Sequence, residues 1–289
     1  MTILHIGHGP HVARVMRLFA RYAPEVGQRK VDYGQAQGQT ADLVIVHNCT
    51  DYPTSVRLDA LPAVASTGGG VVGWVWNDLW KNRSNLAPTM FDECALILAD
   101  AESQSRWVTK TGKWYGHRPL VESEVFHPPA PGAVRDIPVL VARGWKRHRE
   151  YWARETREAL QGMEGVMWVD GKRTPQEMAD LYRRARCVVA LREDAGPSYT
   201  VVEACLCGAV PVVSDCPQMR KVPYSNGVGA RFSCVMAKRD PGSIRQAVER
   251  ALWIPPSEER DQAAYFFDWT AAAQGPALVR RVLEVTRRA

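Results

Sequence analysis

The sequence lacks any apolar run that reads as a membrane span. The nearest candidate, residues 60–77, contains Pro62 and the triplet Gly68-Gly69-Gly70 and does not have the character of a lipid-facing helix. No basic segment precedes an apolar one at the N-terminus, so we expect no signal peptide. No repeat of short period is present. These absences disfavour a membrane-spanning or secreted chain and a repeat protein, and we expect a cytoplasmic location.

Cysteine is sparse and odd in number, with seven residues scattered through 289. This usage is typical of reduced thiols and not of a disulfide framework. Cys205 and Cys207 lie two apart in a predicted helix, so they point to different faces, and we expect small buried apolar residues there instead of metal ligands. His5, His8 and His11 recur every three residues, but a strand and a helix divide them, so we expect no metal site.

Charge is moderate, with 37 Lys and Arg against 31 Asp and Glu and a net charge of +6. Such an excess is compatible with an anionic partner but does not require one. Hydrophobic residues make up 46% and charged residues 24%, which excludes a wholly disordered chain. The length predicts about two domains of roughly 100–200 residues each.

Short apolar runs alternate with longer amphipathic segments along the whole chain. This alternation predicts an α/β protein with parallel sheets and right-handed crossovers. The predicted strands are Ile3–Ile6, Leu43–Val46, Val71–Val75, Ala95–Leu98, Val139–Ala142, Val166–Val169, Cys187–Leu191 and Val210–Ser214. The predicted helices are Val12–Tyr22, Glu102–Thr109, Arg149–Leu160, Gln176–Ala185 and Thr200–Cys207.

A domain boundary is indicated by the segment 127–132, His-Pro-Pro-Ala-Pro-Gly, whose composition is that of a linker. We predict domains over residues 1–127 and 137–255, followed by a mainly helical tail over 256–289. Each domain is expected to be Rossmann-like. The default ligand site of such an arrangement is the cleft between the domains.

The most informative stretch is residues 195–213. A buried strand ends at Leu191, a Gly/Pro/Ser loop follows, and Ser198 is suited to cap a helix whose first N–H groups can bind an anion. Glu203 falls in the second turn, where a carboxylate can accept two hydrogen bonds from a vicinal diol such as a ribose. Gly208 closes the helix. The local pattern equally fits an ordinary strand–helix–strand unit in which Glu203 is a solvated charge or a charge near the helix N-terminus.

This stretch resembles the donor-site motif of retaining glycosyltransferases of family 4, which have the GT-B fold. The order and spacing of further segments match the family as well. These segments are Val139–Lys146 at the opening of the nucleotide-binding domain, Val169–Gly171 with Glu177–Ala185 at the middle helix, Val121–Pro128 between the domains, and Phe267–Trp269 at a C-terminal helix that crosses back to the N-terminal domain.

The resemblance implies a metal-independent transferase that uses a nucleoside-diphosphate sugar such as UDP- or GDP-sugar and needs no cofactor. Glu203 is implied to hold the ribose hydroxyls. Arg143 and Lys146 are implied to face the diphosphate, where cations stabilise the charge that builds on the leaving group, and Arg147 can substitute for Lys146. A solvated basic loop is the alternative. No Asp-x-Asp triplet, the metal-binding motif of other glycosyltransferases, occurs in the chain.

Further donor contacts are expected at the first loop and at the start of the motif helix. Gly7 and Gly9 match the family's glycine-bearing first loop and let the backbone approach a phosphate or sugar. Ser198, Tyr199 and Thr200 lie at the helix start. They complete the predicted donor site.

Two positions depart from the family pattern. Asn77 stands where a His is common, so Asp78 is the better candidate to position or deprotonate an acceptor hydroxyl, with an N-cap role as the alternative. Ala195 stands where the first acid of the donor motif is expected. Asp194 can replace that acid if the loop is shifted by one residue. Alternatively, the donor sugar lacks the hydroxyl group to which that acid would hydrogen-bond.

The acceptor is indicated only by cations and indoles in the first domain. Arg14, Arg17 and Arg21 recur at helical spacing. Trp76 and Asn77 precede Lys81 and Arg83, so an indole and an amide lie beside cations near the presumed sugar site. We predict a polyanionic acceptor such as DNA bearing a hydroxymethylated base. Anionic lipid headgroups, a small-molecule acceptor, or a solvated helix face beside core tryptophans are the alternatives.

Two other functions fit the same fold. A degenerate GT-B protein that binds a nucleotide or polyanion without turnover is favoured by Ala195 and Asn77. A sugar-phosphate epimerase is compatible with the spacing of the motifs. Release of sugar from a nucleotide-sugar distinguishes a transferase from a pure binding module.

Overall fold

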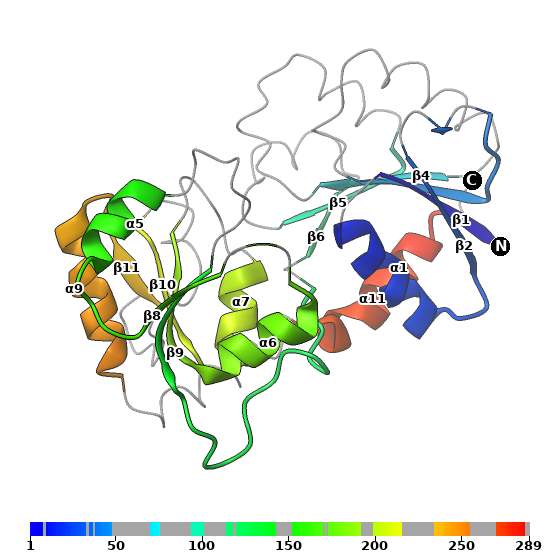
Figure 1. Ribbon diagram of the computed structural model, residues 1–289. Coiled ribbons are helices and arrows are strands. Elements are labelled where there is room, and N and C mark those ends of the chain that lie inside the picture. The colour runs from blue at the N-terminus through cyan, green and yellow to red at the C-terminus, as the bar shows by residue number, and fades with distance from the viewer. Residues whose placement is uncertain are drawn as a thin grey trace. The chain divides into compact units, whose positions relative to one another are not determined.

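The computed structural model describes residues 1–7, 10–32, 35–36, 38–47, 70–75, 94–100, 114–117, 120–142, 152–169, 171, 173–191, 199–215, 234–254 and 270–286. The chain forms two compact units. Unit 1 comprises Met1–Leu120 and Gln274–Ala289, and unit 2 comprises Val121–Ala273. Figure 1 shows the two units with the chain coloured along its length.

Unit 1 contains a parallel sheet of six strands in the order β2-β1-β3-β4-β5-β6. The central strands are continuous apolar runs because both faces of a parallel sheet are covered. The strands are β1 Thr2–Ile6, β2 Gly27–Val31, β3 Leu43–His47, β4 Gly70–Val75, β5 Leu96–Asp100 and β6 Trp114–His117.

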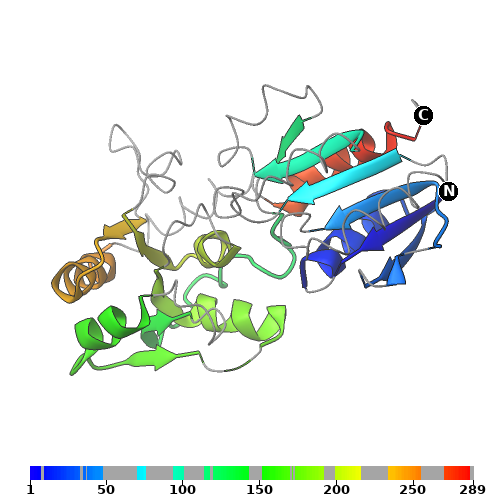
Figure 2. The same ribbon diagram turned by 90° about the horizontal axis from the view of Figure 1, so that it is seen from above.

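Two helices lie side by side on one face of this sheet, α1 (Pro10–Tyr22) and α11 (Ala271–Leu283) (Figures 1 and 2). The apolar stripe of α1 is buried against the strands. Gly275 lets the two helices approach closely, since a Cβ atom built there would lie 2.4 Å from the ring of Tyr22 and 2.8 Å from Leu18.

Unit 2 contains a parallel sheet of five strands in the order β11-β10-β9-β7-β8. The strands are β7 Ile137–Val141, β8 Val166–Trp168, β9 Ala185–Ala190, β10 Val210–Ser214 and β11 Val235–Ala237. The helices are α5 Ala153–Leu160, α6 Pro175–Arg184, α7 Tyr199–Leu206 and α9 Pro241–Leu252.

These helices cover both faces of the second sheet. Side chains of α6 and α7 form one core with the strands, and side chains of α5 and α9 form another on the opposite face (Figure 1). Two parallel sheets with helices confirm the predicted α/β class. No helix within the described ranges is both long and apolar enough to cross a bilayer.

The border between the units lies after Leu120, whereas the Pro/Gly-rich segment suggested one after residue 127. Contacts explain the difference. Val121 pairs with Thr270, its carbonyl accepts a hydrogen bond from the Ala271 N–H at 2.7 Å, and Phe126 is buried in unit 2. The chain then enters α11, whose residues from Gln274 onward belong to unit 1, as the predicted crossover helix requires.

Every predicted strand is present, with ends shifted by a few residues. The helix predicted over Thr200–Cys207 runs from Tyr199 to Leu206, and the one predicted from Arg149 is described over Ala153–Leu160. The helix predicted over Glu102–Thr109 lies outside the described residues. The sequence did not indicate β2, β6, β11 or α9.

Candidate functional site

The order of strands in unit 2 reverses between β7 and β9. From β7 the chain continues to β8 on one side, and from β9 it continues to β10 and β11 on the other. In open parallel sheets, ligands bind outside the carboxyl ends of the strands at such a reversal, because the helices that leave it diverge and open a crevice. In unit 2 this reversal lies at the carboxyl ends of β7 and β9.

Helix α7 begins at this edge of the sheet and carries Glu203 in its second turn. The side chain is only 6% exposed, and it is the one buried carboxylate among the residues that the structure describes. The alternative in which Glu203 is a solvated helix charge is therefore wrong. A buried carboxylate is costly unless it serves a partner or a ligand. Tyr199 and Thr200 are half-buried at the helix start.

The far end of α7 is fixed by a left-handed glycine and an arginine. Gly208 has φ 76°, and the Ala209 N–H donates to the Ala204 carbonyl at 2.9 Å. Arg135 donates to the carbonyls of Cys207 and Ala185, which joins this end to the end of α6. Burial raises the pKa of Cys207 to about 12. The helix that carries Glu203 is thus held firmly, and its buried thiol is inert at neutral pH.

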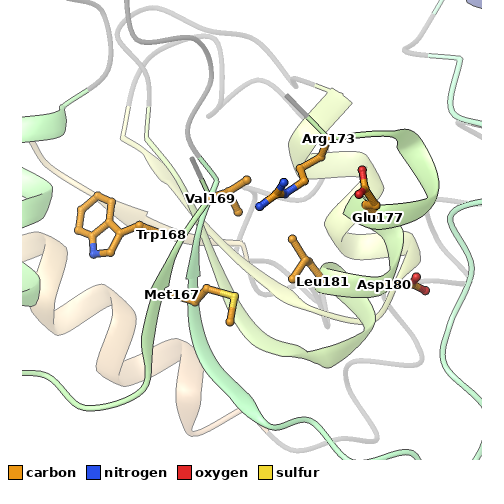
Figure 3. A pocket seen from close by; sticks show the side chains of 7 residues that line it. All are labelled: Met167, Trp168, Val169, Arg173, Glu177, Asp180 and Leu181. Carbon is orange, nitrogen blue, oxygen red and sulfur yellow. The ribbon is translucent and has the colours of Figure 1, made fainter. Parts of the chain in front are cut away.

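A pocket of about 280 Å³ lies beside the edge strand β8, against the first turns of α6. Figure 3 shows the Arg173 side chain extending between Val169 and Leu181, with the Glu177 carboxylate beside it. The pocket thus combines apolar side chains with a cation and a carboxylate. It is lined by Met167, Trp168, Val169, Arg173, Glu177, Asp180 and Leu181.

The loop at this pocket is fixed by a capping box. The Thr174 hydroxyl accepts a hydrogen bond from the Glu177 N–H at 3.2 Å, and Glu177 Oε2 accepts one from the Thr174 N–H at 2.7 Å. The Glu177 carboxylate also accepts a hydrogen bond from the Thr174 hydroxyl at 3.0 Å. Its two hydrogen bonds, from the Thr174 N–H and the Thr174 hydroxyl, hold the pKa of Glu177 below its usual value. The sequence motif Thr-Pro-Gln-Glu signals this cap, yet sequence reasoning did not assign Arg173 or Glu177 to a binding site.

In unit 1 the strand order reverses between β1 and β3, and Gly7 follows β1 at this point. Gly7 has φ 147°, a value that favours glycine, and its N–H donates to the Val31 carbonyl at 3.0 Å. A larger hollow of about 600 Å³ lies at the opposite, amino edge near Thr2 and Asp42. Its position at the amino ends of the strands argues against it as the main site.

A row of polar side chains lies next to this reversal, and its two histidines are buried. His5 Nδ1 is 3.0 Å from His47 Nε2, and His5 Nε2 is 3.1 Å from Gln28 Oε1. Because Gln28 Oε1 only accepts, His5 carries its proton on Nε2, and His47 then donates to His5 Nδ1. His47 also stacks on Trp74. His5 lies within its strand, as predicted, but its pairing with His47 was not foreseen.

The structure does not test most of the predicted site residues. Gly7, Tyr199, Thr200 and Glu203 are described, and the last three share α7. The others lie outside the described residues and stay predictions: Gly9, Trp76, Asn77, Asp78, Lys81, Arg83, Arg143, Lys146, Arg147, Asp194 and Ser198.

No protein-family model and no curated protein matches the sequence. Solved structures do match. Sucrose-phosphate synthase from Thermosynechococcus elongatus superposes with a TM-score of 0.66 at 11% identity, over 100% of this chain and 98% of that one. The chain has the GT-B fold.

Two further GT-B structures match along their whole length. An Escherichia coli structure of trehalose-6-phosphate bound with UDP-2-fluoro glucose has a TM-score of 0.66 at 8% identity, over 100% of this chain and 99% of that one. An alpha-glucosyltransferase in complex with UDP and a 13-mer DNA has a TM-score of 0.63 at 9% identity, over 99% of both chains. At such identities the likeness concerns the fold.

Proposed function

We propose that this chain is a glycosyltransferase that moves a sugar from a nucleoside-diphosphate sugar to a hydroxyl acceptor. The observation that carries the proposal is Glu203, a carboxylate buried on α7 beside the β7–β9 reversal of a GT-B unit. A carboxylate in this place suits a vicinal diol, because its two oxygens can accept both hydroxyl protons of a ribose.

The rest of the donor is assigned around Glu203. The first N–H groups of α7, at Tyr199 and Thr200, suit an anionic diphosphate. The pocket beside β8 suits the base, because Val169 and Leu181 offer apolar contact and Arg173 offers a planar cation for stacking. In our proposal Arg143 and Lys146 stabilise the departing diphosphate, and Arg147 supports them.

We propose retention of configuration and no metal requirement, in line with the sequence resemblance to family 4. Support for retention comes from a neighbour of the same fold, a trehalose-6-phosphate synthase described in terms of glycosyltransfer with retention, at a TM-score of 0.66 and 9% identity. The absence of an Asp-x-Asp triplet supports metal independence.

For the acceptor we propose DNA with a hydroxymethylated base. Support comes from the basic and aromatic segment of Trp76, Lys81 and Arg83 and from the neighbour solved with UDP and DNA. In this proposal Asp78 positions the hydroxyl of the acceptor. The reaction places the protein in the cytoplasm, where nucleotide-sugars and DNA occur together.

Isothermal titration calorimetry of UDP and GDP tests the role of Glu203. We expect Glu203→Gln to weaken binding of the preferred nucleotide by about 1–3 kcal/mol, since a hydrogen bond to a charged group is lost. Glu158→Gln is the matched control, because Glu158 is an exposed carboxylate on α5. Equal binding by both variants and the unchanged protein would refute the assignment.

Turnover is tested with the same proteins. Incubation with a panel of nucleotide-sugars in EDTA should release sugar slowly, and proton NMR of the first product should show the donor's anomeric configuration. Nucleotide binding without any sugar release would favour the non-catalytic binding module instead.

A further inference from the structure

Helix α1 presents a row of arginines away from the sheet. Its apolar stripe faces the strands, whereas Arg17 and Arg21 are exposed. Arg14 is half-buried, and its Nη1 atom is buried. The helix contains no Asp or Glu. Over the four residues from Arg17 to Arg21 a helix rises about 6 Å, so the two exposed side chains are spaced to contact successive charges of a linear polyanion.

Helix α11, which packs beside α1, carries two further arginines near its C-terminal end. It packs against α1 at Gly275, and both helices cover the same face of the unit 1 sheet (Figures 1 and 2). Arg280 is exposed, and Arg281 is partly exposed and pairs with Glu284, the one acidic residue of the helix and its following turn. We call Arg17, Arg21, Arg280 and Arg281 the arginine surface.

The side chains around these arginines decide between two kinds of anionic partner. A helix that lies on a membrane needs large apolar side chains on its exposed face. The large apolar residues exposed in the described part of the chain are Met1, Val134, Met167 and Trp253, and none belongs to α1 or α11. The apolar faces of both helices are buried in unit 1. The arginine surface therefore offers charge without an apolar anchor.

Arginine is well matched to phosphate. Its planar guanidinium donates two parallel hydrogen bonds to phosphate oxygens and keeps its charge at any physiological pH. The guanidinium of Arg21 lies 5.4 Å from the centre of the Tyr22 ring, a cation–π contact that orients it. Duplex DNA carries about one negative charge per 1.7 Å of its axis, so a fixed row of arginines neutralises several phosphates at once.

We propose that the arginine surface binds the phosphate backbone of a nucleic acid. The proposal deepens the function above and rests on it, because it gives the acceptor polymer a docking surface on unit 1. It assigns a role in binding to α11, for which the sequence predicted a crossover helix without a binding role.

Fluorescence anisotropy with a labelled 20-base-pair DNA duplex tests the proposal at 50–300 mM NaCl. We expect log K to fall with log salt at a slope of about −3, since each phosphate contact contributes about −0.9. Arg17→Glu/Arg21→Glu should make the slope shallower by about two and weaken binding at least tenfold at 100 mM NaCl. Arg280→Glu should weaken it as well.

The matched control is Arg157→Glu/Arg250→Glu, which makes the same change of net charge at exposed sites on α5 and α9. Arg17→Gln/Arg21→Gln, compared by circular dichroism, guards against misfolding. The proposal is overturned if the control loses as much affinity as the α1 variant, if the α1 variant binds like the unchanged protein, or if anionic phosphatidylserine vesicles bind while the duplex does not.

UDP binding by the same variants separates this proposal from the donor assignment. The arginine-surface variants should bind UDP as the unchanged protein does. Failure of the unchanged protein to bind any nucleotide would count against the donor site, whereas loss of duplex binding alone concerns the surface.

Discussion

The buried histidine pair is the clearest case in which single residues set a measurable property. Burial lowers the pKa of His5 to about 4, against the smaller opposing effect of its hydrogen bond to Gln28. An unperturbed histidine has a pKa of about 6.5. At pH values between about 4 and 6.5, His5 is protonated in the unfolded chain but neutral in the native protein. Acid therefore favours the unfolded state in this window.

The expected result is a loss of stability as the pH falls from about 6.5 towards 4. The free energy of unfolding should decrease by about 1.4 kcal/mol per pH unit from this group, or about 3 kcal/mol in all. Urea titrations at pH 7, 6 and 5 measure the slope, and His5→Gln supplies the reference, since it removes the titrating group. Identical pH slopes in the two proteins would show that His5 does not titrate in this way.

The sequence identified several important residues but did not predict their burial or the side chains that they contact. It singled out Glu203 but left its burial open, because one charge at a helix position fits either solvent or a ligand. It placed His5 in a strand but could not pair it with His47, since the contact joins strands β1 and β3, which are 42 residues apart at these positions. Side-chain partners between neighbouring strands depend on register, which local patterns do not encode.

At the scale of elements, the central strands were predictable, whereas of the four edge strands only β8 was. β2 reads Gly-Gln-Arg-Lys-Val because an edge strand faces solvent and carries charges that prevent further pairing. β11, three residues long at the other sheet's edge, is too short to show a pattern. Central strands such as β3, Leu-Val-Ile-Val-His, could be recognised in the sequence as continuous apolar runs, because both of their faces are covered.

The close contact between α1 and α11 requires a residue without a side chain at position 275. Gly275→Ala gains about 1 kcal/mol of helix propensity but adds a methyl group where the Tyr22 ring lies. We expect a net loss of about 1–3 kcal/mol in the free energy of unfolding, the usual cost of overpacking. Ala277→Gly on the exposed side of α11 measures the propensity effect alone. Urea denaturation that shows Gly275→Ala to be stabilising would contradict the close packing.

At the scale of the whole molecule, the two units differ in how the chain builds them. Unit 2 is a continuous segment whose ends, Val121 and Thr270, pair with each other. Unit 1 is discontinuous and needs α11 from the end of the chain. Composition suggested a boundary near the prolines, but contacts decide where a unit ends. The loops predicted to hold the diphosphate and the acceptor lie outside the described residues, so the sequence alone supports that part of the site.

This difference predicts unequal behaviour of fragments. A fragment of residues 121–273 should fold by itself, because it contains both of its cores and its closing bridge. A fragment of residues 1–120 should not reach its native state, since the sheet face under α11 would be open to water and the packing of Val285 at Gly70 would be lost. Proton–nitrogen NMR spectra and urea transitions of the two fragments measure this directly.

The matched control joins residues 1–120 to 274–289 by a short Gly/Ser linker. Such a linker can span the gap, because the Val121 carbonyl and the Ala271 N–H are 2.7 Å apart where the chain leaves and re-enters unit 1. We expect this fusion to show a dispersed spectrum and a cooperative urea transition that the fragment 1–120 lacks. If fragment 1–120 already unfolds cooperatively at the same urea concentration as the fusion, α11 adds no stability to unit 1. In that case α11 would not be packed stably against unit 1, and the arginines of α1 and α11 would not form one fixed surface.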